Sequence, residues 1–135
     1  MKTKFDTELT VRPSEIDYNR HVHQAAYLDY LLFARVDQMR RCYEMPIEEF
    51  FKRGLSWATK SISIVYHRSA FMGERLVIRT WVDEIYKTSV RVGFNIMKRE
   101  KEELVAEGES VFVLINAKTG KPEAFTADMI EKFSV

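Results

Sequence analysis

Apolar residues between Ala25 and Tyr43 recur at steps of three and four. That spacing marks one face of an α-helix, here about five turns long. Tyr27, Leu31 and Ala34 widen the apolar stripe, so we expect a helix that other elements cover on most sides. The main stripe consists of Ala25, Leu28, Leu32, Val36, Met39 and Tyr43.

Shorter elements flank this helix. Residues 5–12 are typical of a first strand that ends at Pro13, because proline cannot donate a hydrogen bond to a sheet. Pro46 predicts the start of a second, short helix over residues 47–52, which Gly54 ends. Residues 127–133 favour a last helical turn.

From Ser56 onward the hydrophobic period changes to two, which is typical of strands. The breaks between the alternating runs are too short for crossover helices, so we expect consecutive strands to be antiparallel neighbours. The last run, Val105 to Ile115, is apolar on both faces, as in a central strand. The other alternating sets are Ile62, Ile64 and Tyr66; Leu76, Ile78 and Thr80; and Val90, Val92, Phe94 and Ile96.

The order of strand, long helix and four further strands predicts a single α+β domain over residues 1–135, with the helix packed on one face of the sheet. A sheet with apolar residues on both faces near its centre would, in a monomer, expose to solvent the apolar face that the helix does not cover. We therefore expect a homo-oligomer, a homodimer or homotetramer, joined through sheet edges or faces.

Composition narrows the class of protein. Hydrophobic residues make up 46% and charged residues 30%, as in soluble globular proteins. A net charge of +1 predicts no basic nucleic-acid surface. The single cysteine, Cys42, excludes an internal disulfide and a multi-cysteine zinc site. No secretory signal and no run of about 18 apolar residues is present, so we expect no membrane span and a cytoplasmic location.

The candidate chemistry lies directly before the long helix. Asp17, Asn19 and His21 stand at every second residue, and they supply a carboxylate, an amide and an imidazole. At a helix N-terminus, such groups would place a base beside an oxyanion site. The same spacing also fits an ordinary loop in which Asp or Asn caps the helix. Spacing alone leaves both interpretations open.

A family resemblance favours the catalytic interpretation. Asp17, the pair His21-Val22 and Tyr27 fall at the steps of hotdog-fold thioesterases, specifically the 4-hydroxybenzoyl-CoA thioesterase and YbgC-like branch, which the chain resembles. The run from Asp17 to Val22 is also similar to the Asp-x-Asn-x-His-Val segment of plant acyl-ACP thioesterases. Residues 66–76 resemble the family's second-to-third strand hairpin. The likeness covers roughly residues 9–125.

The resemblance implies a hotdog fold, in which a five-stranded, mainly antiparallel sheet wraps one long central helix. It also implies hydrolysis of an acyl-CoA or acyl-ACP thioester, with Asp17 as base or nucleophile and Asn19 and His21 positioning water, substrate or Asp17. Helix N-terminal amides would hold the oxyanion, and no metal or cofactor is required. The candidate substrate-binding residues are His23, Gln24, Ala25, Tyr27, Trp57 and Arg68.

The chain departs from the family pattern at three places. Arg20 stands where a glycine often precedes the His-Val pair, and it would be strained if the loop needs a positive φ there. Gln24 occupies the place of a histidine that is catalytic in some relatives. Ser69 lies where the plant enzymes use a further carboxylate. Two rival functions are a non-catalytic acyl-thioester binding or scaffolding protein, and a hotdog hydratase or dehydratase, whose His-x(4)-Pro-Gly signature is absent.

Overall fold

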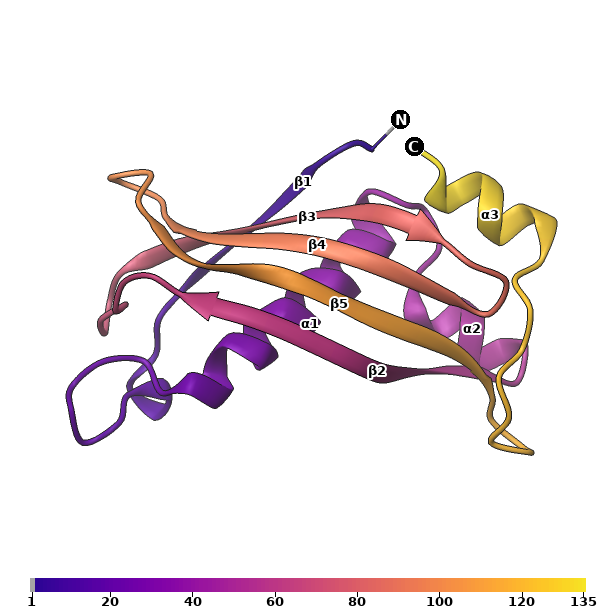
Figure 1. The fold of residues 1–135 in the computed structure, drawn as a ribbon, viewed down its shortest axis with the longest axis horizontal. Coiled ribbons are helices and arrows are strands. Elements are labelled where there is room, and N and C mark those ends of the chain that lie inside the picture. Colours follow the sequence, from indigo (N-terminus) through magenta and orange to yellow (C-terminus); the bar gives the residue numbers. More distant parts are fainter. Residues whose placement is uncertain (1) are drawn as a thin grey trace.

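The computed structural model describes residues 2–135, which form one sheet and one long helix lying across it (Figure 1). The predicted helices over residues 47–52 and 127–133 are confirmed, and so is the long helix. The elements are β1 (Phe5–Thr10), the 3-10 helix η1 (Pro13–Glu15), α1 (Gln24–Arg41), α2 (Ile47–Lys52), β2 (Leu55–Tyr66), β3 (Arg75–Ile85), β4 (Ser89–Lys98), β5 (Leu104–Asn116) and α3 (Ala127–Phe133).

The five strands form one fully antiparallel sheet in the order β1-β3-β4-β5-β2. β5 pairs with β4 on one side and β2 on the other, which confirms the predicted interior position of this strand. β1 and β2 form the two edges of the sheet among residues 2–135.

The predicted hairpin between β2 and β3 is wrong. β2 pairs only with β5, and β3 pairs with β1 and β4, so the two strands lie apart in the sheet. Their connection crosses the end of the sheet and is held by backbone bonds from Arg68 to Val105 (3.2 Å), from Val22 to Ala70 (2.8 Å) and from Gly73 to Val11 (3.1 Å). The connection therefore closes the end of the sheet at which α1 begins.

Helix α1 packs against the concave face of the sheet through Tyr27, Leu31 and Ala34, all buried. Two members of the predicted apolar stripe, Leu32 and Val36, are exposed, and so is Phe33, which lies between them in the sequence and is 55% exposed. The expectation that other elements cover the helix on most sides is wrong for the single chain, because the sheet reaches only one face of so wide a stripe.

The opposite face of the sheet carries several ion pairs. Arg79 pairs with Asp6 (2.8 Å) and Arg91 with Asp83 (2.7 Å), and these side chains alternate along their strands with the buried ones. Apolar side chains share this face: Val111 and Val113 of β5 and Trp81 of β3 are half-buried on it, so the predicted second face is part apolar and part charged. Large apolar side chains are exposed on α1, at Leu32, Phe33 and Val36, and on β2, at Val65 and Tyr66.

Candidate active site

A tight loop carries Asp17 to the N-terminus of α1. An isolated bridge joins Ile16 to Val22, so the five residues between them form the loop. Inside it, the Asp17 N–H donates to the His21 carbonyl (3.0 Å) and the Arg20 N–H donates to the Asp17 carbonyl (3.0 Å). Arg20 has a φ of 69°, so the chain adopts the left-handed conformation there without a glycine.

The loop brings two of the three candidate side chains together. Asp17 Oδ2 lies 3.8 Å from His21 Nδ1, and both groups are partly exposed. The imidazole also packs edge-on against Phe71, with 6.4 Å between ring centres. Asp17 Oδ1 accepts a hydrogen bond from the Asn19 N–H (2.8 Å), which leaves Oδ2 as the oxygen available for chemistry.

Asn19 contributes to this geometry through its backbone. Asn19 is exposed, and its side-chain amide makes no hydrogen bond to other residues among 2–135. The capping interpretation expected an Asp or Asn side chain to accept a hydrogen bond from a backbone N–H of α1. The Asp17 carboxylate instead accepts one from the Asn19 N–H, inside its own loop. The role of Asn19 toward substrate stays a prediction.

The residue that caps α1 is His23. Its Nδ1 accepts a hydrogen bond from the Ala26 N–H (3.2 Å), and its own N–H donates to the Glu15 carbonyl (3.0 Å). The first N–H groups of a helix have no partner within the helix. Those of Gln24 and Ala25, just before Ala26, make no hydrogen bond among residues 2–135. The predicted oxyanion site is thereby narrowed to two exposed amides.

Two tyrosines form the wall behind these amides. Tyr27 is buried, and its ring centre lies 5.4 Å from that of Tyr66 on β2. The Tyr66 hydroxyl donates to the Gln24 carbonyl (3.4 Å), so the last residue of β2 touches the first residue of α1. Burial raises the pKa of the Tyr27 phenol, which stays neutral and packs rather than transferring protons.

Glu15 is a site residue that the sequence analysis did not single out. It is only 8% exposed, and its carboxylate accepts hydrogen bonds from the Tyr30 hydroxyl (2.7 Å) and the Arg12 N–H (2.9 Å). Burial acts to raise its pKa, but these bonds and the Arg12 guanidinium outweigh it and lower the pKa. Because the Glu15 carbonyl also holds His23, this residue anchors the loop to β1 and α1. The sequence signal that could have identified Glu15 is Pro13 followed two residues later by an acidic residue, a pattern typical of the first turn of a helix.

Of the substrate-binding candidates, Trp57 lies far from the loop and Arg68 lies at the loop's end of the sheet. Trp57 is the third residue of β2, whose first residues lie at the end of the sheet away from the start of α1 (Figure 1), and it packs against Phe50 and Phe125. Arg68 lies in the β2–β3 connection, on the same end as the loop, and forms an exposed ion pair with Glu103 (3.4 Å). One chain therefore gathers Gln24, Ala25 and Tyr27 near Asp17 but not Trp57.

Among residues 2–135 no three His, Cys, Asp or Glu side chains are grouped so that they could hold a metal ion. Over the same residues, no helix has the length and apolar character needed to cross a membrane.

Comparison with known proteins identifies the class. Residues 11–133 match the family model of the thioesterase-like superfamily. The chain therefore belongs to the thioesterase-like superfamily. At the level of the family, the predicted class of enzyme, a thioesterase, is confirmed together with the hotdog fold.

Individual relatives span the chain. It is 26% identical over 126 residues to the long-chain acyl-CoA thioesterase FadM of Escherichia coli, a match that covers 93% of this chain and 94% of that enzyme. The crystal structure of a DHNA-CoA thioesterase from Staphylococcus aureus superposes with a TM-score of 0.91 at 23% identity, covering 97% of this chain and 89% of that one. A chloroplastic acyl-acyl-carrier-protein hydrolase, FATB2 of Cuphea viscosissima, is 29% identical over 73 residues, which is 54% of this chain and 18% of that protein.

Proposed function

We propose that the protein hydrolyses an acyl-CoA thioester and that Asp17 is its catalytic carboxylate. The observation that carries the proposal is geometric. Asp17 Oδ2 stands 3.8 Å from His21 Nδ1 on a loop that leads into α1, whose first residues present two free N–H groups. Family membership supports the reaction class, and the relatives named as acyl-CoA thioesterases support CoA as the carrier.

The reaction needs a base or nucleophile and a place for the oxyanion. Asp17 takes a proton from water, whose oxygen then attacks the thioester carbon, or it attacks that carbon directly. The negative charge moves to the carbonyl oxygen, which the N–H groups of Gln24 and Ala25 stabilise. The C–S bond then breaks, and the leaving thiolate takes up the proton that Asp17 removed from water. After direct attack, the product on Asp17 is a mixed anhydride, which a water molecule hydrolyses to the free acid and the Asp17 carboxylate while the thiolate takes up a proton from that water.

The magnitudes are sufficient for a reactive thioester. A positioned base contributes about 10²–10⁴ in rate. One well-placed oxyanion donor contributes about 10²–10³. In this scheme His21 holds the carboxylate in orientation, with the ring of Phe71 behind the imidazole.

We also propose how the protein binds the carrier part of its substrate and how two chains associate. Arg68 and the exposed Arg20 are cations on the loop end of the molecule, suited to the phosphates of CoA or of an acyl-carrier protein. The unpaired edge of β2 suits association with a second copy of the chain, and a homodimer would set the two β2 strands side by side.

A turnover panel tests the function. The purified protein is assayed for free thiol release from short, long and aryl acyl-CoA, and from acyl-ACP, while binding of each is measured by calorimetry. The proposal expects thiol release from at least one acyl-CoA. Tight binding with no release from any thioester would instead favour an acyl-thioester binding protein. With a 2-enoyl-CoA included in the panel, water addition to its double bond without thiol release would favour a hydratase.

A further inference from the structure

A lysine occupies an inward-facing position of β4, where the alternating pattern predicts an apolar residue. Val90, Val92, Phe94 and Ile96 lie on the buried face of the sheet, and Lys98 is the next residue of β4 on that face. Only 8% of Lys98 is exposed. Burying an ammonium ion is unfavourable because the ion loses its hydration, so its surroundings must compensate for that loss.

Two residues of the β2–β3 connection contact the Lys98 ammonium. Its Nζ lies 3.2 Å from Glu74 Oε2 and 5.0 Å from the ring centre of Phe71. The other carboxylate oxygen, Glu74 Oε1, accepts a hydrogen bond from the Phe71 N–H (2.7 Å), and the Glu74 N–H donates to the Phe71 carbonyl (3.1 Å). Lys98 therefore binds a turn whose two ends are also bound to each other.

The Phe71 ring joins this turn to the candidate active site. It contacts the Lys98 ammonium and also packs edge-on against the His21 imidazole, at 6.4 Å between ring centres. Phe71 is 45% exposed, so its contacts with Lys98 and His21 fix the position of a ring that solvent reaches on its other side. His21 Nδ1 lies 3.8 Å from Asp17 Oδ2. A series of contacts therefore runs from Lys98 through Phe71 and His21 to the Asp17 carboxylate.

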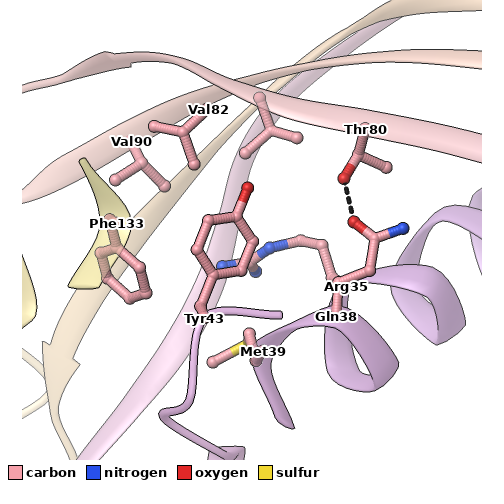
Figure 2. Close-up of a pocket in the computed structure, with 9 residues that line it drawn as sticks. Arg35, Gln38, Met39, Tyr43, Thr80, Val82, Val90 and Phe133 are labelled. Carbon is pink, nitrogen blue, oxygen red and sulfur yellow. Dashed lines mark hydrogen bonds between the residues drawn. The ribbon is translucent and has the colours of Figure 1, made fainter. Parts of the chain in front are cut away.

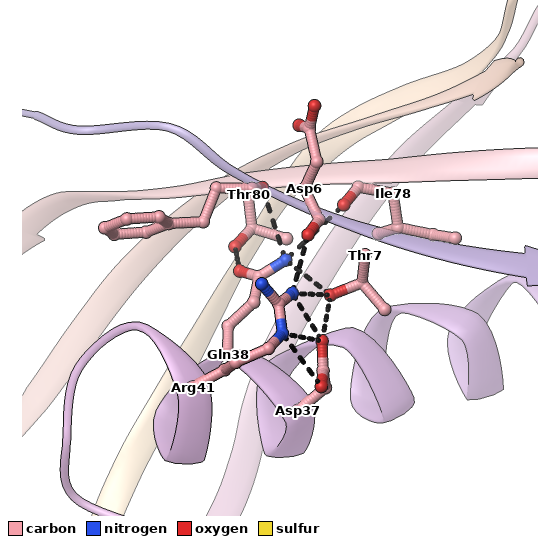
Figure 3. A network of polar contacts seen from close by, with 8 residues as sticks. Asp6, Thr7, Asp37, Gln38, Arg41, Ile78 and Thr80 are labelled. Carbon is pink, nitrogen blue, oxygen red and sulfur yellow. Dashed lines mark hydrogen bonds and ion pairs between the residues drawn. The ribbon is translucent and has the colours of Figure 1, made fainter.

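The buried amide of α1 has its partners away from the loop. The Gln38 amide nitrogen donates to Thr7 Oγ1 (3.0 Å) and its amide oxygen accepts from the Thr80 hydroxyl, so this network joins α1 to β1 and β3 (Figure 3). Gln38 also lines a cavity of about 20 Å³ (Figure 2), and no residue of the Asp17 loop lines that cavity. These interior groups therefore do not contact the candidate active site.

The buried charged residues, by contrast, lie beside the loop. Within residues 2–135 they are Glu15 and Lys98. The Glu15 carbonyl holds the His23 N–H at the start of α1 (3.0 Å), and the Lys98 ammonium contacts the ring behind His21. A buried ion pair is a weak source of stability, because desolvation offsets the attraction between the charges. What the Lys98 pair does is to order the turn that carries Phe71.

We propose that Lys98 is a positioning residue for the reaction. Its ammonium, bound to Glu74, holds the Phe71 ring against the His21 imidazole and so keeps the Asp17 carboxylate directed at the thioester carbon. This inference rests on the proposed thioesterase function. It adds to that function a residue of β4 that touches neither the substrate nor the reacting atoms.

Lys98→Met tests the inference on hexanoyl-CoA, palmitoyl-CoA and benzoyl-CoA, using the one that the wild type hydrolyses fastest. The substitution removes the cation and keeps an unbranched side chain in the core. We expect kcat to fall by about 10- to 100-fold, as for a catalytic group displaced by about 1 Å, with KM within about threefold of the wild-type value. Lys98→Arg keeps a cation beside Glu74 and Phe71 and should restore kcat to within about threefold of wild type.

Lys4→Met is the matched control. The Lys4 Nζ also lies over an aromatic ring, 4.6 Å from the centre of Trp81, but close to the N-terminus and away from the loop (Figure 1). This variant should keep the wild-type kcat. Phe71→Leu removes the intervening ring from an exposed position, so it should fold and reproduce the loss of kcat even if Lys98→Met does not fold.

A double mutant separates positioning from a structural effect. In the Asp17→Asn background, Lys98→Met should lower kcat no further, because the carboxylate that Lys98 positions is already absent. An equal loss in both backgrounds would overturn the inference while the role of Asp17 stands. A kcat of Lys98→Met equal to that of the wild type would overturn it as well.

NMR of the His21 ring gives a readout that does not depend on turnover. The chain has three histidines, and the His21 Cε1–H resonance, assigned with His21→Gln, should shift in Lys98→Met but not in Lys4→Met. Absence of thiol release by the wild type would contradict the thioesterase function. The resonance would then test the contact series by itself, and an unshifted resonance in Lys98→Met would overturn the positioning of His21 by Lys98.

Discussion

Arg20 is held in the left-handed region at a φ of 69°, a conformation that glycine adopts without steric conflict. The loop between Ile16 and Val22 thus keeps the backbone shape for which related loops use glycine, even though the side chain has changed. The predicted strain at Arg20 is confirmed in its backbone angle. The loop geometry is set by the bridge and the Asp17 bonds, which outweigh the preference of a single residue.

Replacing Arg20 by glycine should therefore stabilise the protein. The left-handed conformation is unfavourable by about 1–2 kcal/mol for an L-residue. Glycine relieves this but gains freedom in the unfolded chain, so we expect a net gain of about 0.5–1 kcal/mol. The melting temperature should rise by about 2–4 °C. Arg20→Ala is the control, because it removes the same side chain and keeps Cβ; a lower melting temperature for Arg20→Gly than for Arg20→Ala would contradict this account.

Glu15 links pH to stability. Its pKa is lowered below the ordinary value of 4.5, because hydrogen bonds from Arg12 and Tyr30 outweigh burial. A carboxylate with a lowered folded pKa contributes stability above its unfolded pKa and loses that contribution as the pH falls through the folded value. The contribution is therefore complete at pH 7 and is lost progressively below about pH 4.5.

Glu15→Gln should lower the free energy of unfolding at pH 7 by about 1–2 kcal/mol, because a neutral amide accepts weaker hydrogen bonds than a carboxylate. The difference from wild type should shrink as the pH approaches 3. Urea unfolding at both pH values measures it. Glu84→Gln serves as the control, since Glu84 is exposed and makes no side-chain hydrogen bond or ion pair within residues 2–135. A difference independent of pH would show that Glu15 is not the linked group.

At the scale of elements, periodicity predicted which segments are helices and strands but not which strands are neighbours. The connection of residues 67–74 is short enough for a hairpin, yet it crosses the sheet because β5 pairs with β2 and displaces β3. Chain length cannot distinguish these outcomes. The same crossing brings Ala70 to Val22 and so supports the active-site loop. The motif near Asp17 was predictable because its residues are adjacent in sequence, whereas Glu15 was not, because its partner Tyr30 lies 15 residues further along the chain.

The start of α1 gives a second element-level test. His23 caps the helix by accepting from the Ala26 N–H, so His23→Ala should lower the free energy of unfolding by about 0.5–2 kcal/mol. His23→Asn restores a good capping acceptor and should recover most of this loss. Thermal unfolding of the two variants decides the matter, and equal destabilisation by Ala and Asn would show that the cap does not depend on the side-chain acceptor.

For the whole molecule, the sheet face turned away from α1 and the apolar residues exposed on α1 and β2 determine how copies of the chain can associate. Ion pairs such as Arg79–Asp6 lie on the face turned away from α1, and the apolar side chains of β5 on that face, Val111 and Val113, are half-buried rather than exposed. The edge of β2 has no neighbour within the described chain, and Val65 on this strand is exposed. We therefore expect association through β2 rather than through the sheet face.

Sedimentation should show a species of two or four chains. Val65→Lys should shift it toward the monomer, because a charge on an edge strand opposes pairing with a second strand. Tyr86→Lys is the matched control: Tyr86 is similarly exposed but lies in the β3–β4 turn, away from β2. A wild type with the mass of one chain, or equal dissociation by both variants, would refute the expected interface.

The central claim is that the Asp17 carboxylate performs the hydrolysis, and one substitution tests it most directly. Asp17→Asn keeps the oxygen that accepts from the Asn19 N–H, so the loop should persist, but it removes the base. On whichever acyl-CoA the wild type hydrolyses, kcat should fall by about 10²–10⁴ while substrate binding persists. Asp29→Asn, an exposed carboxylate on α1, should leave kcat unchanged. A kcat of Asp17→Asn equal to that of the wild type would contradict the account.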